Sequence, residues 1–163
     1  MNKILITGSN GLLGQKLVKL ILEKGEYELI ATSRGENRIA DLYPDINYQN
    51  LDICNKEEVS SIIEEYKPSF VINTAAMTNV DQCETERELC WDLNVNSVEY
   101  LVEACEANNA HLIHLSTDFI FDGEDGPYKE DAKPNPVSYY GDTKLAAEVV
   151  LNNLKCKSTI LRT

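Results

Sequence analysis

Short runs of apolar and β-branched residues recur along the chain and alternate with segments whose apolar residues follow helical spacing. The runs have the length of buried strands, and the segments between them are long enough for helices. This alternation is typical of βαβ units, which build a parallel sheet. The six predicted strands cover residues 3–8, 27–33, 46–52, 69–76, 111–117 and 158–163.

Helices are predicted between these strands. The first runs from Leu12 to Lys24, and Gly25 follows it as a glycine stop signal. Its predicted apolar face consists of Leu13, Leu17, Leu20 and Ile21. The other predicted helices cover residues 56–66, about 86–108, and a last segment from Val137 or Ser138 to about Leu154.

The chain has 163 residues, which suits one domain with one core. No internal repeat, low-complexity tract or linker interrupts the alternation. With right-handed crossovers, six parallel strands and their helices form a three-layer α/β/α arrangement. The sequence therefore predicts an α/β fold with a Rossmann-type, doubly wound parallel sheet.

Composition narrows the classes of partner. Apolar residues make up 43% of the chain and charged residues 26%, as in an ordinary globular protein. The 27 acidic and 15 basic residues give a net charge of −12. This charge repels a nucleic-acid backbone or an anionic membrane surface, so we expect neither as a partner.

The cysteines carry no recognisable redox or metal motif. The five of them include no C-x-x-C pair and have no histidine at metal-binding spacing, so we interpret them as reduced packing residues and expect no metal site. No run approaches the ~20 apolar residues of a membrane span, and no export signal is visible. We therefore expect a cytoplasmic protein. The cysteines are Cys54, Cys83, Cys90, Cys105 and Cys156.

Three glycines lie between the first predicted strand and the first predicted helix. Gly8, Gly11 and Gly14 form a G-x-x-G-x-x-G pattern in the position that a dinucleotide-binding turn requires. The first glycine permits the turn, the second lets the backbone approach a pyrophosphate, and the third permits close packing of the helix on the sheet. The alternative is that all three are simply turn and packing residues.

The segment after the second predicted strand bears on the choice of cofactor. NAD sites usually have an acidic residue there, whereas this chain has Ser33 and Arg34, with Arg38 close behind. Arginines suit a 2′-phosphate, so NADP(H) is the preferred cofactor and NAD(H) the alternative. Arg38 is equally well explained as a solvated charge. Asp52 is placed either to accept the adenine amino group or to cap the next helix.

A second group of residues suits proton transfer. Tyr140 and Lys144 are four residues apart on one predicted helix and therefore share a face. An ammonium beside a phenol lowers the pKa of the phenol toward neutral pH. Lys144 can also donate to the nicotinamide ribose, and Thr117 leaves the fifth predicted strand, where it could hydrogen-bond a substrate carbonyl. Tyr139 is turned away from that face. Taken alone, the tyrosine and lysine are better explained as a surface pair, but their place after the fifth strand of a sheet with this glycine turn favours the catalytic role.

Together these stretches resemble a known superfamily. The three glycines, "NTAA" at 73–76, "LNVNS" at 93–97, "STD" at 116–118 and "YGDTK" at 140–144 resemble the extended short-chain dehydrogenases/reductases, in the same order and spacing. Within that superfamily, "AAMTNVDQCE", "STDFIFDG" and "YGDTKLAAE" are similar to the dTDP-4-dehydrorhamnose reductase family. The resemblance covers essentially the whole chain.

The resemblance implies a role for residues that pattern alone leaves ambiguous. It implies Thr117, Tyr140 and Lys144 as the catalytic set, with Asn94 supporting them through its helix. The cofactor residues that it implies are Asn10, Gly11, Leu12 and Leu13 at the pyrophosphate, Asp52 and Ile53 at the adenine, and Ala75 and Ala76 beside the ribose. Without it, the alanines are small packing residues and Asn94 a buried amide. His111 and His114 match no catalytic position and are interpreted as packing or strand-edge residues.

Two substitutions and one missing part separate this chain from the family pattern. Met77 stands where members usually have tyrosine, and Ser138 where they have asparagine, both positions that we expect to face the substrate. Members also continue beyond the sixth strand into a C-terminal substrate-binding part, which is absent from this chain. We therefore expect residues 1–163 to form an NAD(P)-binding Rossmann domain.

The leading hypothesis is an NADP(H)-dependent reductase of a 4-keto-6-deoxy sugar nucleotide, with Tyr140 as the proton donor. Phe119 stands where a 4,6-dehydratase is expected to have an acidic residue, which argues against dehydration. The alternatives are a sugar-nucleotide epimerase, a redox-sensing NADP-binding domain, and a non-catalytic subunit that resembles the regulatory β subunit of methionine adenosyltransferase. A homodimer is compatible with all of them.

Overall fold

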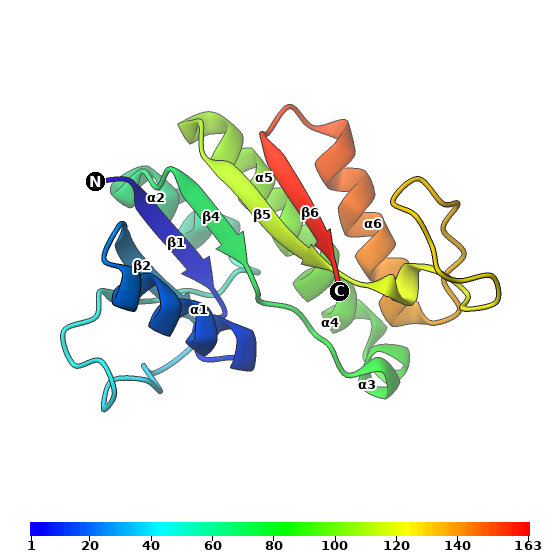
Figure 1. The fold of residues 1–163 in the computed structure, drawn as a ribbon, viewed down its shortest axis with the longest axis horizontal. Coiled ribbons are helices and arrows are strands. Elements are labelled where there is room, and N and C mark those ends of the chain that lie inside the picture. Colours follow the sequence, from blue (N-terminus) through cyan, green and yellow to red (C-terminus); the bar gives the residue numbers. More distant parts are fainter.

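The structure is a computed structural model that describes residues 1–163. Six parallel strands form one sheet in the order β3-β2-β1-β4-β5-β6. The arrowheads of β1, β4, β5 and β6 point to the same edge of the sheet in Figure 1. The strands are β1 (Lys3–Thr7), β2 (Glu28–Ser33), β3 (Tyr48–Asn50), β4 (Phe70–Asn73), β5 (His111–Ser116) and β6 (Ser158–Arg162).

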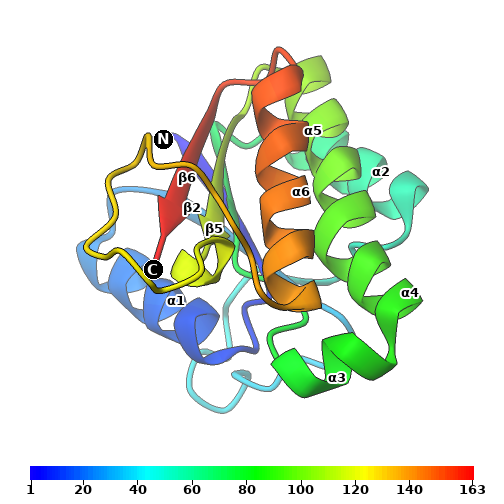
Figure 2. The ribbon, with the colours of Figure 1, turned by 90° about the vertical axis from the view of Figure 1, so that its right-hand side faces the viewer.

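Helices cover both faces of this sheet, which confirms the predicted three-layer, Rossmann-type fold. Helix α1 lies on one face, and α2, α5 and α6 lie on the other (Figure 2). The helices are α1 (Leu12–Lys24), α2 (Lys56–Tyr66), α3 (Val80–Thr85), α4 (Arg87–Trp91), α5 (Ser97–Asn108) and α6 (Tyr139–Asn153). A π-helical turn, η1 (Asp92–Asn96), joins α4 to α5, and a 3₁₀ turn, η2 (Asp118–Ile120), follows β5.

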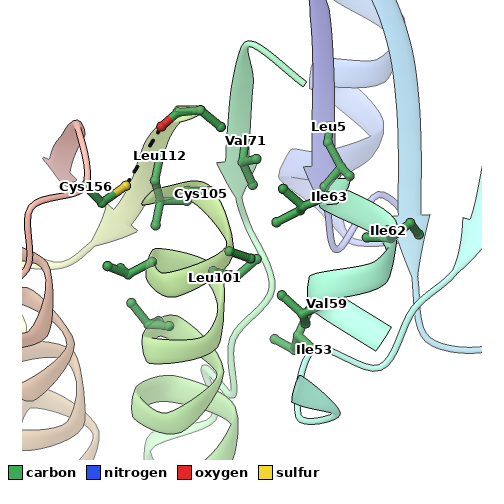
Figure 3. Packing of buried hydrophobic residues seen from close by; sticks show 14 of the residues in the cluster. Leu5, Ile53, Val59, Ile62, Ile63, Val71, Leu101, Cys105, Leu112 and Cys156 are labelled. Atoms are coloured by element: carbon green, nitrogen blue, oxygen red, sulfur yellow. Dashed lines mark hydrogen bonds between the residues drawn. The ribbon is translucent and has the colours of Figure 1, made fainter. Parts of the chain in front are cut away.

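The central strands are apolar at nearly every position because both of their faces are buried. Successive side chains of a strand point to opposite faces. Leu5 of β1 therefore joins the core under α2 and α5, whereas its neighbours Ile4 and Ile6 pack on the α1 side. In Figure 3, Leu5, Val71 and Leu112 meet Val59 and Ile63 of α2 and Leu101 and Cys105 of α5. The alternation of strand side chains thus divides the core into two layers.

The predicted buried face of α1 is confirmed in part. Ile21 is buried and Leu17 packs against the core, whereas Leu13 and Leu20 are exposed, and Gly14 and Val18 are the other buried residues. The cause is the contact at Gly14, which turns that side of the helix toward the preceding loop. Gly25 does end the helix, in the left-handed conformation predicted for a glycine stop.

Two strand boundaries also differ from the prediction. Strand β3 covers only residues 48–50, and β4 ends at Asn73 because the Thr74 hydroxyl donates to the Thr7 carbonyl and turns the chain away from the sheet. The predicted helix 86–108 is confirmed by α4, η1 and α5, which run on from Arg87 to Asn108. The polar helix α3, which Asn79 caps, was not predicted, and Glu86, whose φ of −115° and ψ of 54° are not helical, separates it from α4.

The cysteines are all free thiols, and four of the five are buried, which confirms that they are packing residues. The predicted helix 56–66 is confirmed as α2, but its cap is Asn55, whose side chain accepts from the backbone N–H groups of Glu57 and Glu58. The helix-capping alternative for Asp52 is therefore wrong. No helix of the structure has both the length and the apolar character needed to cross a membrane.

Candidate active site

The candidate site lies at the carboxyl edge of the sheet, where β1, β4 and β5 end. In the strand order of this fold, β1 and β4 are neighbours whose following segments diverge to opposite faces. Such a switch point leaves a crevice outside the strand ends, where ligands bind in open α/β sheets. The glycine turn after β1 and the segment after β4 meet at this point.

The turn after β1 needs glycine at its first position. Gly8 has a φ of +72°, and a Cβ there would come within 2.9 Å of both the Ala75 nitrogen and the Thr74 hydroxyl oxygen. A side chain would therefore be strained in its own backbone conformation and would collide with the segment after β4. The predicted role of the first glycine in the turn is confirmed, and Ala75 and Ala76 lie half-buried beside it.

The third glycine lets the helix press on the turn itself. A Cβ at Gly14 would lie 2.2 Å from the Gly8 carbonyl oxygen and 2.7 Å from the Ser9 Cα. We expected this glycine to permit packing on the sheet, but its contact is with the loop backbone. Gly11 precedes α1 without capping it, so no side chain occupies the first backbone N–H groups of the helix. Leu12 and Leu13 are both exposed there.

One buried polar atom in this turn has no partner. The Ser9 side chain is fully buried, and its hydroxyl oxygen forms no hydrogen bond. Buried hydroxyl groups are normally hydrogen-bonded. The Ser9 and Gly11 backbone N–H groups already donate to the Thr32 and Gly8 carbonyls, so the first N–H groups of the uncapped helix α1 are the backbone donors that remain for an anion.

The arginine segment after β2 is held against this turn by Asn10 and Tyr48. The Asn10 amide donates to the Glu36 carbonyl and to the Tyr48 hydroxyl, and its oxygen accepts from the Arg38 backbone N–H. The Tyr48 hydroxyl donates to the Ser33 and Gly35 carbonyls. The side chain of Asn10, predicted near a pyrophosphate, therefore serves to fix the loop that presents the arginines.

The residues predicted around the adenine and 2′-phosphate fall into two groups. Arg34 and Arg38 are exposed, and Arg34 lies 3.9 Å from the carboxylate of half-buried Asp52. Asp52 also accepts from the Cys54 backbone N–H at 2.9 Å. Ile53, in contrast, is 6% exposed and belongs to the core beneath α2. Only its backbone is therefore available to a ligand.

The second part of the site is built by the start of α6 against the turn after β5. Ser138 caps α6 by accepting from the Gly141 backbone N–H at 3.1 Å. A Cβ at Gly141 would lie 2.4 Å from the Phe119 carbonyl oxygen, so only glycine allows this close approach. Tyr140, the preceding residue, packs edge to face on Phe119 with ring centroids 5.9 Å apart.

Thr117 and Tyr140 come together at this junction. Thr117 caps the 3₁₀ turn by accepting from the Phe119 backbone N–H, and its hydroxyl lies beside the Tyr140 phenol. Burial raises the pKa of Tyr140 above its ordinary value, and a hydrogen bond from Thr117 opposes this in part. Tyr139 turns the other way, as predicted, and its hydroxyl donates to the Arg87 carbonyl.

Lys144 is fully buried and points back to strand β5. Its Nζ donates to the Leu115 carbonyl at 2.6 Å and lies 3.2 Å from Nε2 of His114. Burial lowers the pKa of Lys144 to about 8, against the opposing charge of Glu148. The expectation that this ammonium lowers the pKa of Tyr140 is wrong for this structure, because burial dominates at the phenol and Lys144 is turned to the strand.

His114 is buried, as predicted for a packing residue. Its two ring nitrogens also contact Asn73 and Lys144, which the sequence did not indicate. The alternation of β5 indicates its burial, because His114 shares the buried face of the strand with Leu112 and Ser116. His111, by comparison, lies at the start of the strand and contacts Thr159.

Asn94 joins the segment after β4 to α6. Its oxygen accepts from the Met77 backbone N–H at 2.8 Å, and its amide donates to the Met77 carbonyl and to the Thr143 hydroxyl. It is thus a buried helix amide, and it also fixes the helix that carries Tyr140 and Lys144. Met77 does not face a substrate cavity as expected; it packs with Cys83, Cys90 and Tyr140.

A cavity of about 410 Å³ opens beside the first turn of α6. Ser138 and Phe119, which flank Tyr140, form part of its wall. The lining is largely apolar with two carboxylates, and consists of Val80, Asp118, Phe119, Phe121, Asp122, Gly123, Tyr128, Val137 and Ser138.

Comparison with known proteins identifies the family. The RmlD substrate binding domain matches residues 1–163. The chain belongs to this family. This RmlD domain is 42% identical to dTDP-4-dehydrorhamnose reductase of Aggregatibacter actinomycetemcomitans over 164 residues, which cover 100% of the chain and 51% of that protein. The resemblance inferred from the sequence motifs is thereby confirmed.

Two further similarities bear on function. The RmlD domain superposes on a crystal structure of dTDP-4-dehydrorhamnose reductase from Bacillus anthracis in complex with NADP, with a TM-score of 0.84 and 32% identity, over 99% of this chain and 53% of that one. It is also 35% identical to methionine adenosyltransferase 2 subunit beta of Xenopus tropicalis, over 93% of this chain and 43% of that protein. The chain spans about half the length of these relatives.

Proposed function

We propose that residues 1–163 form the NADP(H)-binding, proton-donating domain of a reductase that acts on a 4-keto-6-deoxy sugar nucleotide. One observation carries the proposal: a buried phenol, Tyr140, lies beside Thr117 at the sheet edge that also carries the glycine turn. A bound nicotinamide supplies the hydride that reduces the keto carbon.

The glycine turn fits a dinucleotide. Gly8 and Gly14 let the turn pack tightly on the segment after β4 and on α1, and the uncapped start of α1 offers backbone N–H groups to the pyrophosphate. The unpartnered Ser9 hydroxyl is an additional donor at the same place. Leu12 and Leu13 contribute their backbone, and Ala75 and Ala76 leave room for the ribose opposite the turn.

NADP(H) is favoured over NAD(H) by the exposed arginines. Asn10 and Tyr48 fix the loop that carries Arg34 and Arg38, so the two guanidinium groups are presented at the end of β2. A 2′-phosphate takes up such donors with short, charge-assisted hydrogen bonds. The related reductase solved with NADP supports the same choice.

Tyr140 can supply the proton because its phenol is protonated at neutral pH. Burial raises its pKa, which keeps the phenol protonated and also makes it a weaker acid in the free protein. In our proposal Tyr140 donates this proton to the oxygen of the sugar ketone, and Thr117 orients that oxygen by a hydrogen bond. The cavity bordered by Phe119 and Ser138 lies next to Tyr140 and Thr117, which do not line it themselves.

The test is NADPH oxidation by the full-length gene product with dTDP-4-keto-6-deoxy-L-mannose, measured beside Tyr140→Phe and Tyr139→Phe variants. Loss of the general acid lowers kcat by about 10²-fold or more, whereas Tyr139→Phe keeps wild-type turnover. Equal turnover in the two variants would overturn the role of Tyr140. Absence of turnover in the wild type, despite NADPH binding, would overturn the reductase proposal.

A regulatory subunit is the second candidate, because the chain is 35% identical to a methionine adenosyltransferase β subunit. That function needs cofactor binding but no proton donor. Stoichiometric copurification with a methionine adenosyltransferase, together with no reduction of the keto sugar, would favour it. In that case Tyr140→Phe changes neither NADPH affinity nor complex formation.

A further inference from the structure

Four buried polar side chains form a continuous chain across the sheet. Thr7, Asn73 and His114 occupy facing positions on β1, β4 and β5, and Lys144 of α6 completes the series. The Thr7 hydroxyl lies 2.5 Å from Asn73 Oδ1, Asn73 Nδ2 lies 3.2 Å from His114 Nδ1, and His114 Nε2 lies 3.2 Å from Lys144 Nζ. Each residue is at most 1% exposed.

The hydrogen atoms in this chain are strongly constrained. The Thr7 hydroxyl donates to the Asn73 oxygen, so the Asn73 amide donates to Nδ1 of His114. A neutral imidazole has one N–H, which must then lie on Nε2 and point at Lys144. That N–H needs a lone pair to accept it, and only the neutral amine of Lys144 has one. This arrangement therefore belongs to a deprotonated lysine.

The protonated lysine requires the opposite arrangement. An ammonium has three donors and no acceptor, so Nε2 of His114 must accept from it. The imidazole proton then lies on Nδ1, and the terminal amide group of Asn73 flips so that its oxygen faces this proton. Lys144 differs by one proton between the two arrangements, and His114 keeps one proton in both. When Lys144 loses its proton, the first arrangement is favoured, because in it the Thr7 hydroxyl donates to the Asn73 oxygen.

We propose that His114 is a positioning residue that holds the Lys144 amine in both protonation states by exchanging its tautomer together with the Asn73 amide. The role of this network in catalysis rests on the proposed function. The coupling between His114 and Lys144 does not, because it follows from the hydrogen bonds of the four side chains. An imidazole can accept from the ammonium and donate to the amine without changing its own charge.

The electrostatic surroundings agree with this assignment. Burial and the Lys144 charge lower the pKa of His114 to about 3, so the ring stays neutral near pH 7. Lys144 is faced by Glu148 on α6 and Cys90 on α4, which oppose the effect of burial on its pKa. Glu148 is itself paired with Arg162 at 2.8 Å and accepts from Ser116. Both the ammonium and the neutral amine of Lys144 are therefore accessible near neutral pH.

The first test is the tautomer of His114, read from the ¹⁵N shifts of histidine-labelled chain between pH 6 and pH 10. The chain has only two histidines, so His111 is an internal reference. We expect the His114 proton to lie on Nδ1 below the pKa of Lys144, about 8, and on Nε2 above it. The change disappears in a Lys144→Met variant. A single pH-independent tautomer in the wild type, or protonation of His114 near pH 6.5, would overturn the proposal.

The second test is the pH profile of kcat for NADPH oxidation by the full-length gene product, in which we assign Lys144 the role of donor to the nicotinamide ribose. The part of the profile that follows the titration of Lys144 then shifts by about one pH unit in His114→Gln, with little change in KM, whereas His111→Gln leaves the profile unchanged. If His114→Gln lowers kcat equally at every pH without shifting the profile, the substitution has only disturbed packing, and this result contradicts the proposal. If the wild type shows no turnover, the reductase assignment fails, and the tautomer measurement still decides the coupling.

Discussion

The two halves of the candidate site are constructed in opposite ways. At the end of β1, the site is made by leaving side chains out: Gly8 and Gly14 let backbone approach backbone. At the end of β5, it is made by buried side chains, with Lys144 and His114 hydrogen-bonded inside the protein. The glycine turn is therefore disrupted when a side-chain atom is added, and the buried network is disrupted when a polar atom is removed.

The largest effect is expected at Gly14. A Gly14→Ala variant puts its Cβ 2.2 Å from the Gly8 oxygen, so either the helix or the turn must move. Overpacking against backbone costs about 3 kcal/mol of unfolding free energy, to be measured by urea denaturation.

Gly25→Ala is the matched control for this prediction. Gly25 has a φ of +63°, but a Cβ there would meet nothing within 4 Å. The cost is then backbone strain alone, about 1 kcal/mol. Equal losses of unfolding free energy in the two variants would contradict the steric explanation of the glycine turn.

A substitution at Asn94 tests the half of the site that depends on buried polar side chains. Replacing it with leucine keeps the approximate volume but removes the partners of the Met77 backbone and of Thr143. Unpaired buried polar groups lower the unfolding free energy by about 2 kcal/mol. Asn96→Leu is the control in the same turn: its amide donates to Asp92 at the surface, and its loss changes stability by about 0.5 kcal/mol or less. A similar cost at both positions would argue against the buried network.

The loss of unfolding free energy at acidic pH is a further test of the half of the site that is built from buried side chains. The pKa of His114 is about 3 in the folded chain and 6.5 in its ordinary state, so the unfolded chain binds one more proton between these values. Stability is therefore lost as the pH falls from 6.5 toward 3, by about 1.4 kcal/mol per pH unit from this group. Denaturation at several pH values should show a shallower slope in His114→Gln and an unchanged slope in His111→Gln.

The smallest expected effect concerns the exposed arginines. A double Arg34→Ala, Arg38→Ala variant lowers NADPH affinity by about tenfold, the size of one charged hydrogen bond, and leaves NADH affinity nearly unchanged. Fluorescence titration of both cofactors measures this, with Arg87→Ala as an exposed control on α4. Parallel losses for NADPH and NADH would show that the arginines do not select the 2′-phosphate.

Much of the fold could be predicted from local pattern. The bounds of α1 and α2 and the glycine end of α1 follow from spacing and stop signals that act within one turn of helix. The polar helix α3 could not be predicted in this way, because its start depends on the Asn79 cap and its end on one non-helical residue. The prediction that Leu13 and Leu20 lie on the buried face of α1 was wrong, because the contact of Gly14 with the preceding loop also decides how the helix is turned.

By itself, the sequence determined the α/β fold, the glycine turn and the helix that carries Tyr140 and Lys144, because each depends on residues a few positions apart. Only the tertiary structure decided where Lys144 points and what His114 does. Thr7, Asn73 and His114 are separated by 66 and 41 residues along the chain. They meet because parallel strands bring facing positions together, and burial then makes each of their hydrogen bonds obligatory.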